Sequence, residues 1–206
     1  MAPKRKTFAT LRKEERKARQ GIIVDAAERL FGRKPFEQVS MREIAQEAGI
    51  AVSSIYRYFP DQQSLFVEAF VLGTQEIIAR VDQRIASGQL SNLSDFSLMY
   101  LDFLIEHDHY FRMMTHFMLD GQLSGPLLEK LNQATRSILE QFDRLMAGDS
   151  PSERTRQHAH AMFASLNGIL ISFRNYPGRK PAEVRSHMEK LARLIASMCE
   201  SHHRLT

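Results

Sequence analysis

The residues best suited to contact another molecule lie close together between Val52 and Tyr58. Arg57 carries a planar fork of N–H donors that matches the acceptor edge of guanine, and Val52 offers a methyl surface for thymine. Hydroxyl groups reach phosphate oxygens or base edges, and here they belong to Ser53, Ser54, Tyr56 and Tyr58. This combination of side chains suits recognition of DNA in its major groove.

A helix-turn-helix between about residues 40 and 59 would position these side chains. Ser40 and Glu43 have the spacing of a capping box, which predicts a short helix that starts after Ser40. Gly49 supplies the left-handed residue that ends this helix. Ala45 leaves room for a close helix crossing. The alternative is a plain helical hairpin in which Gly49 is only a C-cap.

The next helix is expected over Val52 to Tyr58, because Phe59 precedes a proline and is disfavoured in the α region. A preceding helix should end at Lys34-Pro35. Its buried face has apolar residues at helical spacing, namely Ile22, Ile23, Ala26, Ala27, Leu30 and Phe31. The residues expected to face this helix are Ile44, Ala48, Ile50, Ile55 and Phe59.

Positive charge is concentrated near the start of the chain. Residues 1–60 hold 13 lysines and arginines against 7 acidic residues, whereas the remainder holds 15 against 17. A basic module joined to a slightly acidic body is typical of polyanion binding. The run from Arg12 to Arg19 fits a solvated helix face equally well. We expect Arg12, Lys13 and Arg16 to contribute general attraction to phosphates.

The same region, from about Arg16 to Phe70, contains five short motifs. They are Ile23-Val-Asp-Ala-Ala27 with Leu30-Phe31, Val39-Ser-Met-Arg-Glu-Ile-Ala45, Ala48-Gly49-Ile50, Ile55-Tyr-Arg-Tyr-Phe59 and Ser64-Leu65-Phe66. In these motifs the region resembles the TetR family of bacterial regulators. The resemblance implies a DNA-binding head of three helices, a bridging fourth helix, and a variable helical body that dimerises and binds an inducer.

Three positions depart from the family pattern. Pro35 stands where the family usually has glycine, Ala51 where a serine or threonine commonly caps the recognition helix, and Gln62 where a lysine commonly contacts phosphate. Gln62 is kept as a candidate DNA contact at that lysine position. The resemblance then leaves more of the phosphate anchoring to the basic arm, Arg42, Tyr56 and Tyr58.

The whole chain is predicted to be all-α, with about nine helices, because apolar residues recur at helical spacing and little alternates with period two. After the helix that Asp61 caps, breaks are expected at Ser87-Gly88 and around residues 120–126, 148–151 and 177–181. The expected domains are residues 1–72, with the basic arm and the DNA-binding head, and residues 73–206, the ligand-binding and dimerisation body.

Two apolar stripes near the end of the chain are wide enough to be buried. The first contains Ala159, Met162, Phe163, Leu166, Ile169, Leu170 and Phe173, and the second Met188, Leu191, Ala192, Ile195, Met198 and Cys199. The stripes alone fit packing within one chain as well as a dimer. The resemblance favours a homodimer through both helices, with Gly168 allowing close approach.

Aromatic and methionine residues crowd the middle of the chain. Such a cluster is more commonly ordinary core than a cavity, but the resemblance favours an inducer pocket for a small apolar molecule. The pocket residues would be Phe103, His107, Tyr110, Phe111, Met114, Phe117, Met118, Met162, Phe163 and Asn167. His107, Tyr110 or Asn167 would orient a polar end. Histidines two residues apart point to different helix faces, so we expect no metal site.

Other classes of protein fit the sequence less well. No apolar region follows Lys4, Arg5 and Lys6 as in a secretory signal, and no run approaches the ~20 apolar residues of a membrane helix. The single Cys199 cannot form an internal disulfide, and a cytoplasmic location is expected. We find no catalytic triad, phosphate loop or cofactor motif, so we do not expect an enzyme.

The expected function is that of a dimeric repressor, which binds a palindromic operator in double-stranded DNA and is released by a small apolar inducer. The alternative is an architectural protein that coats DNA without sequence preference.

Overall fold

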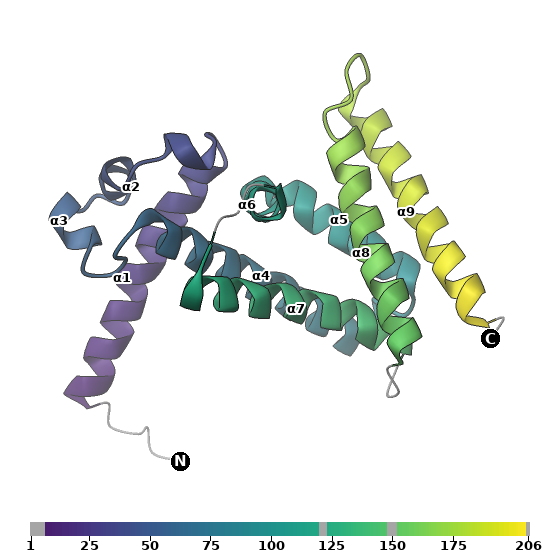
Figure 1. Ribbon diagram of the computed structural model, residues 1–206, viewed down its shortest axis with the longest axis horizontal. Coiled ribbons are helices and arrows are strands. Elements are labelled where there is room, and N and C mark those ends of the chain that lie inside the picture. The colour runs from purple at the N-terminus through teal and green to yellow at the C-terminus, as the bar shows by residue number, and fades with distance from the viewer. Residues whose placement is uncertain (1–6, 120–122, 148–151, 205–206) are drawn as a thin grey trace. The chain divides into compact units, whose positions relative to one another are not determined.

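The computed structural model describes residues 7–119, 123–147 and 152–204. These residues form nine α-helices and one 3₁₀ turn without any strand, which confirms the all-α prediction (Figure 1). The chain divides into two compact units, residues 1–72 with 108–131 and residues 73–107 with 132–206. Residues 108–131 thus group with the first unit, whereas the predicted domains divide the chain once, at residue 72.

The first unit holds the elements of the predicted helix-turn-helix. Its elements are α1 (Phe8–Phe31), η1 (Phe36–Gln38), α2 (Met41–Glu47), α3 (Val52–Ile55), the start of α4 (Gln62–Ala86), α6 (Asp108–Leu119) and the first residues of α7 (Gly125–Ala147). In this unit α1 packs against α2 and α6, and α2 packs against α3. We call α1 to the start of α4 the head.

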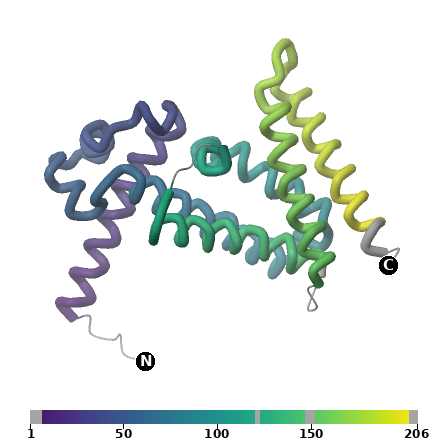
Figure 2. The backbone as a smooth tube through the Cα atoms, in the orientation of Figure 1, coloured from purple at the N-terminus to yellow at the C-terminus, as the bar shows by residue number. Residues whose placement is uncertain are grey.

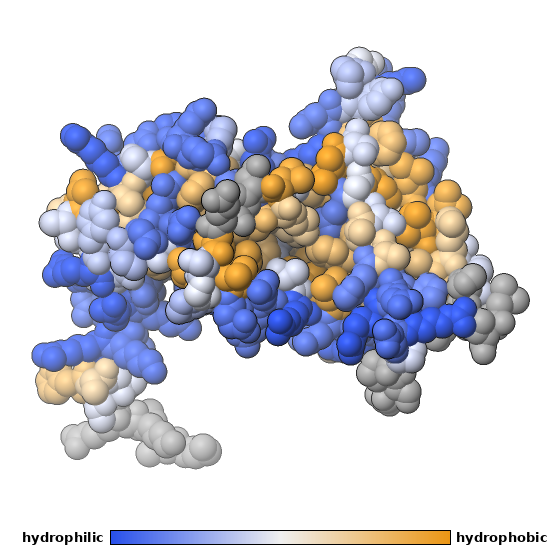
Figure 3. Space-filling model, viewed as in Figure 1, coloured by the Kyte–Doolittle hydropathy of each residue, from blue (hydrophilic) through white to orange (hydrophobic). Residues whose placement is uncertain are grey.

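Helix α1 is longer than its buried face. Burial begins at Ile23 and continues to Phe31, whereas residues 8–19 are exposed. Figure 3 shows hydrophilic side chains over most of this exposed half. The extension is helical for local reasons: Thr7 caps it by accepting the N–H of Thr10, and its lysines, arginines and glutamates are strong helix formers.

The start of α2 and the turn that follows it both have the predicted chemistry. Ser40 accepts the N–H of Glu43 at 3.2 Å while the Glu43 carboxylate accepts the N–H of Ser40 at 3.0 Å, which completes the capping box. Gly49 has φ +68°, and a Cβ there would meet no atom within 4 Å. Glycine is therefore required for its backbone conformation rather than for space.

Helix α3 is shorter than predicted, because regular helix ends at Ile55. The N–H groups of Arg57 and Tyr58 bond to the carbonyls three residues earlier, at 3.3 and 2.9 Å. These are the bonds of a tightened last turn. Asp61 caps α4 as predicted, since its carboxylate accepts the N–H of Ser64 at 2.7 Å.

The second unit contains the rest of α4, α5 (Leu93–Glu106), most of α7, α8 (Glu153–Phe173) and α9 (Pro181–Arg204). Helix α9 packs against both α5 and α8, and the tube in Figure 2 shows α8 and α9 side by side in opposite directions. The break between α5 and α6, at His107, contains neither glycine nor proline, and the sequence pattern gave no signal for it.

The apolar stripe on α8 lies inside its own subunit. Met162, Leu166 and Leu170 are fully buried, as are most of their neighbours on the stripe. On α9, Met188 and Ala192 are buried as well, but Met198 is 60% exposed. The packing within one chain that the sequence left open therefore accounts for the α8 stripe, and a partner would need a different face of this helix.

Replacing Ser40 with alanine should lower the free energy of unfolding of the head by about 1 kcal/mol, because the N3 amide loses its cap. Urea denaturation followed by helical circular dichroism measures this loss. Ser172→Ala, at an exposed position inside α8, is the control and should change stability little. Equal effects of the two substitutions would contradict the assigned cap.

Candidate nucleic-acid interface

The outer face of α3 and of the tightened turn that follows it, which together span residues 52–58 and are called the α3 face, carries most of the predicted base contacts. Val52 and Tyr56 are 39% and 52% exposed, and Ser53 and Arg57 are also exposed. Ile55, on the opposite side of the same turn, is completely buried. The helix is thus anchored from one side and leaves a mixed apolar and polar surface on the other.

The Arg57 side chain is already oriented in the free protein. Its Nη2 donates to the Ser54 hydroxyl at 3.1 Å. This bond uses one of five N–H donors, so the guanidinium keeps donors for a base edge. Ser54 is half-buried and acts here as a support for Arg57.

Tyr58 is held against α1 rather than directed outward. The Arg16 guanidinium lies 5.4 Å from the centre of the Tyr58 ring and donates to the Arg57 carbonyl at 3.2 Å. A hydrogen bond with Tyr58 raises the pKa of Arg19 above its usual value, helped by the nearby Glu15 carboxylate. Arg16 of α1 therefore holds the end of residues 52–58, a role that sequence analysis did not assign to it.

Gln62 has a structural partner. Its side-chain amide donates to the Phe36 carbonyl at 2.7 Å in a partly buried position. This bond ties the start of α4 to η1, so the glutamine does not extend outward as the family lysine is expected to do. Arg42, in contrast, is exposed and makes no ion pair with any other described residue.

Several cations beside this face have no acidic partner among the described residues. Arg12, Lys13 and Lys17 project from the exposed half of α1. Lys34 and Arg29 are instead paired with Glu43 and Glu47. The hydrogen bond from Lys34, together with those at Ser40, lowers the pKa of Glu43. Positive charge available for phosphates is therefore concentrated on α1 and at Arg42.

The predicted ligand-binding residues fall into both units. Those of the first unit are Tyr110, Phe111, Met114, Phe117 and Met118. Tyr110 stacks on Phe70 with ring centres 5.0 Å apart, and Phe111 and Met114 are buried. The rings of Phe117 and Phe66 have centres 4.8 Å apart, whereas Met118 is 48% exposed.

The other five predicted ligand-binding residues belong to the second unit. The Phe103 ring stacks on the His107 ring with ring centres 4.2 Å apart, and Met162 and Phe163 are buried. The Asn167 amide donates to the Phe163 carbonyl at 2.8 Å and to the Tyr100 hydroxyl at 3.3 Å. Its own carbonyl oxygen, Oδ1, is buried without a hydrogen-bond partner. Asn167 thus has an unused acceptor in an apolar setting.

Metal binding and membrane spanning find no support in the part of the chain that the structure describes. No group of three or more histidine, cysteine, aspartate or glutamate side chains there could hold a metal ion. None of the described helices is long and apolar enough to cross a membrane.

Residues 23–69, from α1 through α3 to the start of α4, match the family model of bacterial regulatory proteins, tetR family. The head is a TetR-family DNA-binding domain. This assignment confirms the resemblance seen in the sequence, and the matched residues of the TetR-family head include all of α2 and α3.

Solved structures of transcriptional regulators have the same fold. FadR from Bacillus subtilis in complex with stearoyl-CoA superposes with a TM-score of 0.68 at 18% identity, over 85% of this chain and 97% of that chain. The fatty acid degradation regulator FadR from Bacillus halodurans superposes with a TM-score of 0.67 at 16% identity, over 86% of this chain and 94% of that chain. A putative transcriptional regulator from Saccharomonospora viridis in complex with choline superposes with a TM-score of 0.64 at 16% identity, over 83% of this chain and 93% of that chain.

Replacing Arg57 with alanine should cost ~1–3 kcal/mol at the preferred DNA sequence and relax base preference at one position in each half-site. Arg12→Ala is the matched control, since Arg12 is an exposed arginine on α1. Arg12→Ala should weaken binding to all DNA sequences alike and reduce the dependence of the binding constant on salt concentration. Fluorescence anisotropy on preferred and random duplexes measures both effects. Equal losses on the two duplexes for Arg57→Ala would contradict its assignment to a base.

Proposed function

We propose that this chain is a cytoplasmic, dimeric transcription repressor that binds a palindromic operator through α3 and is released by a small apolar molecule. The observation that carries the proposal is the exposed face of α3 in a TetR-family head, with Arg57 oriented by Ser54. The proposal has three parts, namely sequence-specific binding, dimerisation and ligand response.

The composition of the α3 face favours sequence-specific binding over architectural coating of DNA. Arg57 is its only charged residue, beside Val52, Ser53 and Tyr56. A protein that only neutralises phosphates would present many lysines and arginines at its contact surface. Base edges are instead recognised by methyl groups, hydroxyls and guanidinium forks, which is the composition seen here.

Repeated selection from a random pool of DNA duplexes separates these two functions. A dimer with two recognition helices should enrich a palindrome whose half-sites are about 10 base pairs apart. A pool that stays random after selection would favour the architectural alternative.

A dimer face is available on the sides of α8 and α9 that do not pack within the subunit. Ile171, Leu194 and Met198 are 58%, 56% and 60% exposed. Gly168 precedes Ile171 by one helical turn, and a Cβ at this glycine would meet no atom within 4 Å. Small residues on an outer helix face let a second helix approach closely, and exposed apolar residues gain from its contact. Figure 3 shows hydrophobic side chains exposed on α9.

Replacing Leu194 with glutamate should dissociate the dimer without unfolding the subunit, because the leucine is more than half exposed. Operator affinity should fall by at least about tenfold, since a monomer spans only one half-site. Leu128→Glu, at a leucine of α7 that is 39% exposed, is the control. Sedimentation equilibrium gives the oligomeric state. An intact Leu194→Glu dimer would exclude this face.

The unused acceptor of Asn167 supports ligand binding in the second unit. The Asn167 side chain lies beside aromatic residues, since its Nδ2 donates to the Tyr100 hydroxyl and the Tyr100 ring contacts Phe142 and Phe163. An unpaired buried carbonyl costs free energy that a donor on a ligand would recover. FadR from Bacillus subtilis, which has the same fold, was solved in complex with stearoyl-CoA, and this supports a small-molecule role for the fold here.

A ligand with an apolar chain and one hydroxyl, such as 1-decanol, should raise the Tm and weaken operator binding. Glucose, which is polar throughout, should do neither, because its hydroxyls would lose their hydration in an apolar site. Differential scanning fluorimetry and anisotropy on the selected duplex test both ligands. Stabilisation by glucose alone would contradict an apolar site.

A further inference from the structure

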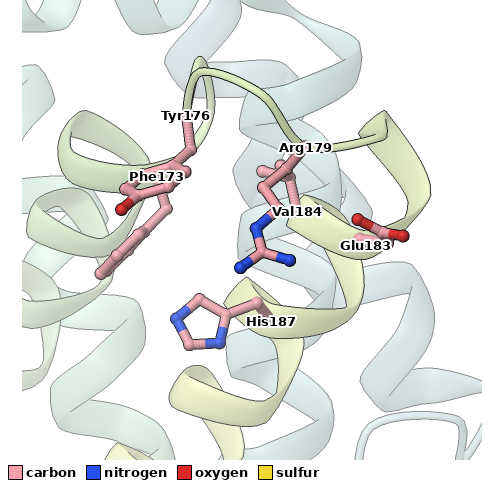
Figure 4. A pocket seen from close by; sticks show the side chains of 6 residues that line it. All are labelled: Phe173, Tyr176, Arg179, Glu183, Val184 and His187. Carbon is pink, nitrogen blue, oxygen red and sulfur yellow. The ribbon is translucent and has the colours of Figure 1, made fainter.

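A second candidate ligand site lies at the turn that joins α8 to α9, within the second unit. A hollow of about 380 Å³ opens there. Its lining consists of Phe173, Tyr176, Arg179, Glu183, Val184 and His187 (Figure 4). These residues come from the end of α8, the connecting turn and the first two turns of α9. The hollow shares none of them with the expected inducer pocket.

One wall of the hollow is aromatic. The rings of Phe173 and Tyr176 have centres 6.2 Å apart and are tilted by 33°. The His187 ring meets the edge of Phe173 at 4.9 Å in a nearly perpendicular arrangement. Val184 is only 8% exposed and adds an aliphatic surface. Together they form an apolar wall large enough for a single ring, although Tyr176 itself is half exposed.

Arg179 supplies an uncommitted positive charge. Figure 4 shows its guanidinium extending into the hollow, between the aromatic residues and Glu183 and above His187. The guanidinium has no hydrogen bond or ion pair with any described residue. Several other arginines of the same unit are paired, for example Arg144 with Asp82 and Arg185 with Asp102. A free guanidinium fork beside an aromatic wall matches a carboxylate attached to a ring.

The charges around the hollow favour a single negative charge on the ligand. Glu183 also lines it, and its carboxylate accepts the backbone N–H of Lys180 at 3.4 Å. This negative charge offsets part of the attraction to Arg179. The second negative charge of a dianion, such as a phosphate monoester, would meet Glu183 with no second arginine or lysine in the lining to pair with.

We propose that this hollow binds a planar aromatic carboxylate. The carboxylate accepts hydrogen bonds from Arg179 and His187, and the ring lies against Phe173 and Tyr176. The site is independent of DNA binding and of the apolar inducer.

Isothermal titration with benzoate tests the site in the full-length protein. Benzamide has nearly the same shape without the charge, so it should bind at least about tenfold more weakly. Phenyl phosphate should bind no more tightly than benzoate. Arg179→Gln should weaken benzoate binding by at least about tenfold, because the ion pair is lost. Lys180→Gln removes the same charge one residue away, outside the lining, and should change the affinity for benzoate by less than about twofold.

Two results would overturn the proposal. The first is the absence of benzoate binding, as expected if side chains of a partner subunit fill the hollow. The second is equal weakening by Arg179→Gln and Lys180→Gln, which would indicate general charge attraction. Operator affinity, measured on the same variants, stays unchanged in either case, so this test is separate from that of the repressor function.

Discussion

The DNA-binding face depends on the anchoring of a recognition helix that is too short to be stable alone. Four residues make barely one turn, and an isolated turn of helix does not form in water. Its position must come from its neighbours. Gly49 turns the chain at φ +68°, the side chains of Ile55 and Phe59 are buried, and Arg16 of α1 contacts the Tyr58 ring just after the helix. These neighbours fix the position of the exposed side chains that we propose to contact bases.

This anchoring gives the cations of α1 two roles. Arg16 supports the end of residues 52–58, whereas Arg12, Lys13 and Lys17 remain available to phosphates. Ion pairs at exposed positions contribute little to stability, so unpaired cations on α1 cost the fold little. The exposed half of α1 is therefore better explained by attraction to DNA phosphates than by packing within the subunit.

The features predictable from the sequence are those with local causes. The capping box at Ser40, the turn at Gly49 and the cap at Asp61 each depend on residues within a few positions of one another. The bonds of Gln62 to Phe36 and of Arg16 to Arg57 join residues far apart in the chain. Only the folded chain brings these partners together.

Periodicity likewise predicted which face of α8 is apolar but not what covers it. A stripe of large apolar residues fits a subunit interior and a dimer interface equally. Burial of Leu166 assigns the stripe to the interior. The small and apolar residues near Gly168 and Ile171, which the stripe does not contain, then become the candidate interface. The hollow near Arg179 could not be foreseen either, because its lining residues share no motif.

The central claim is that two copies of α3 are presented one DNA turn apart, and a distance measurement tests it most directly. Spin labels at Gln46→Cys, an exposed position on α2 outside the proposed DNA contacts, in a Cys199→Ser background would be measured by pulsed electron paramagnetic resonance on the selected duplex. The account predicts one narrow distribution, which places the two α3 helices about 34 Å apart, the separation of successive major grooves. A broad distribution, or no dipolar coupling between labels, would contradict it.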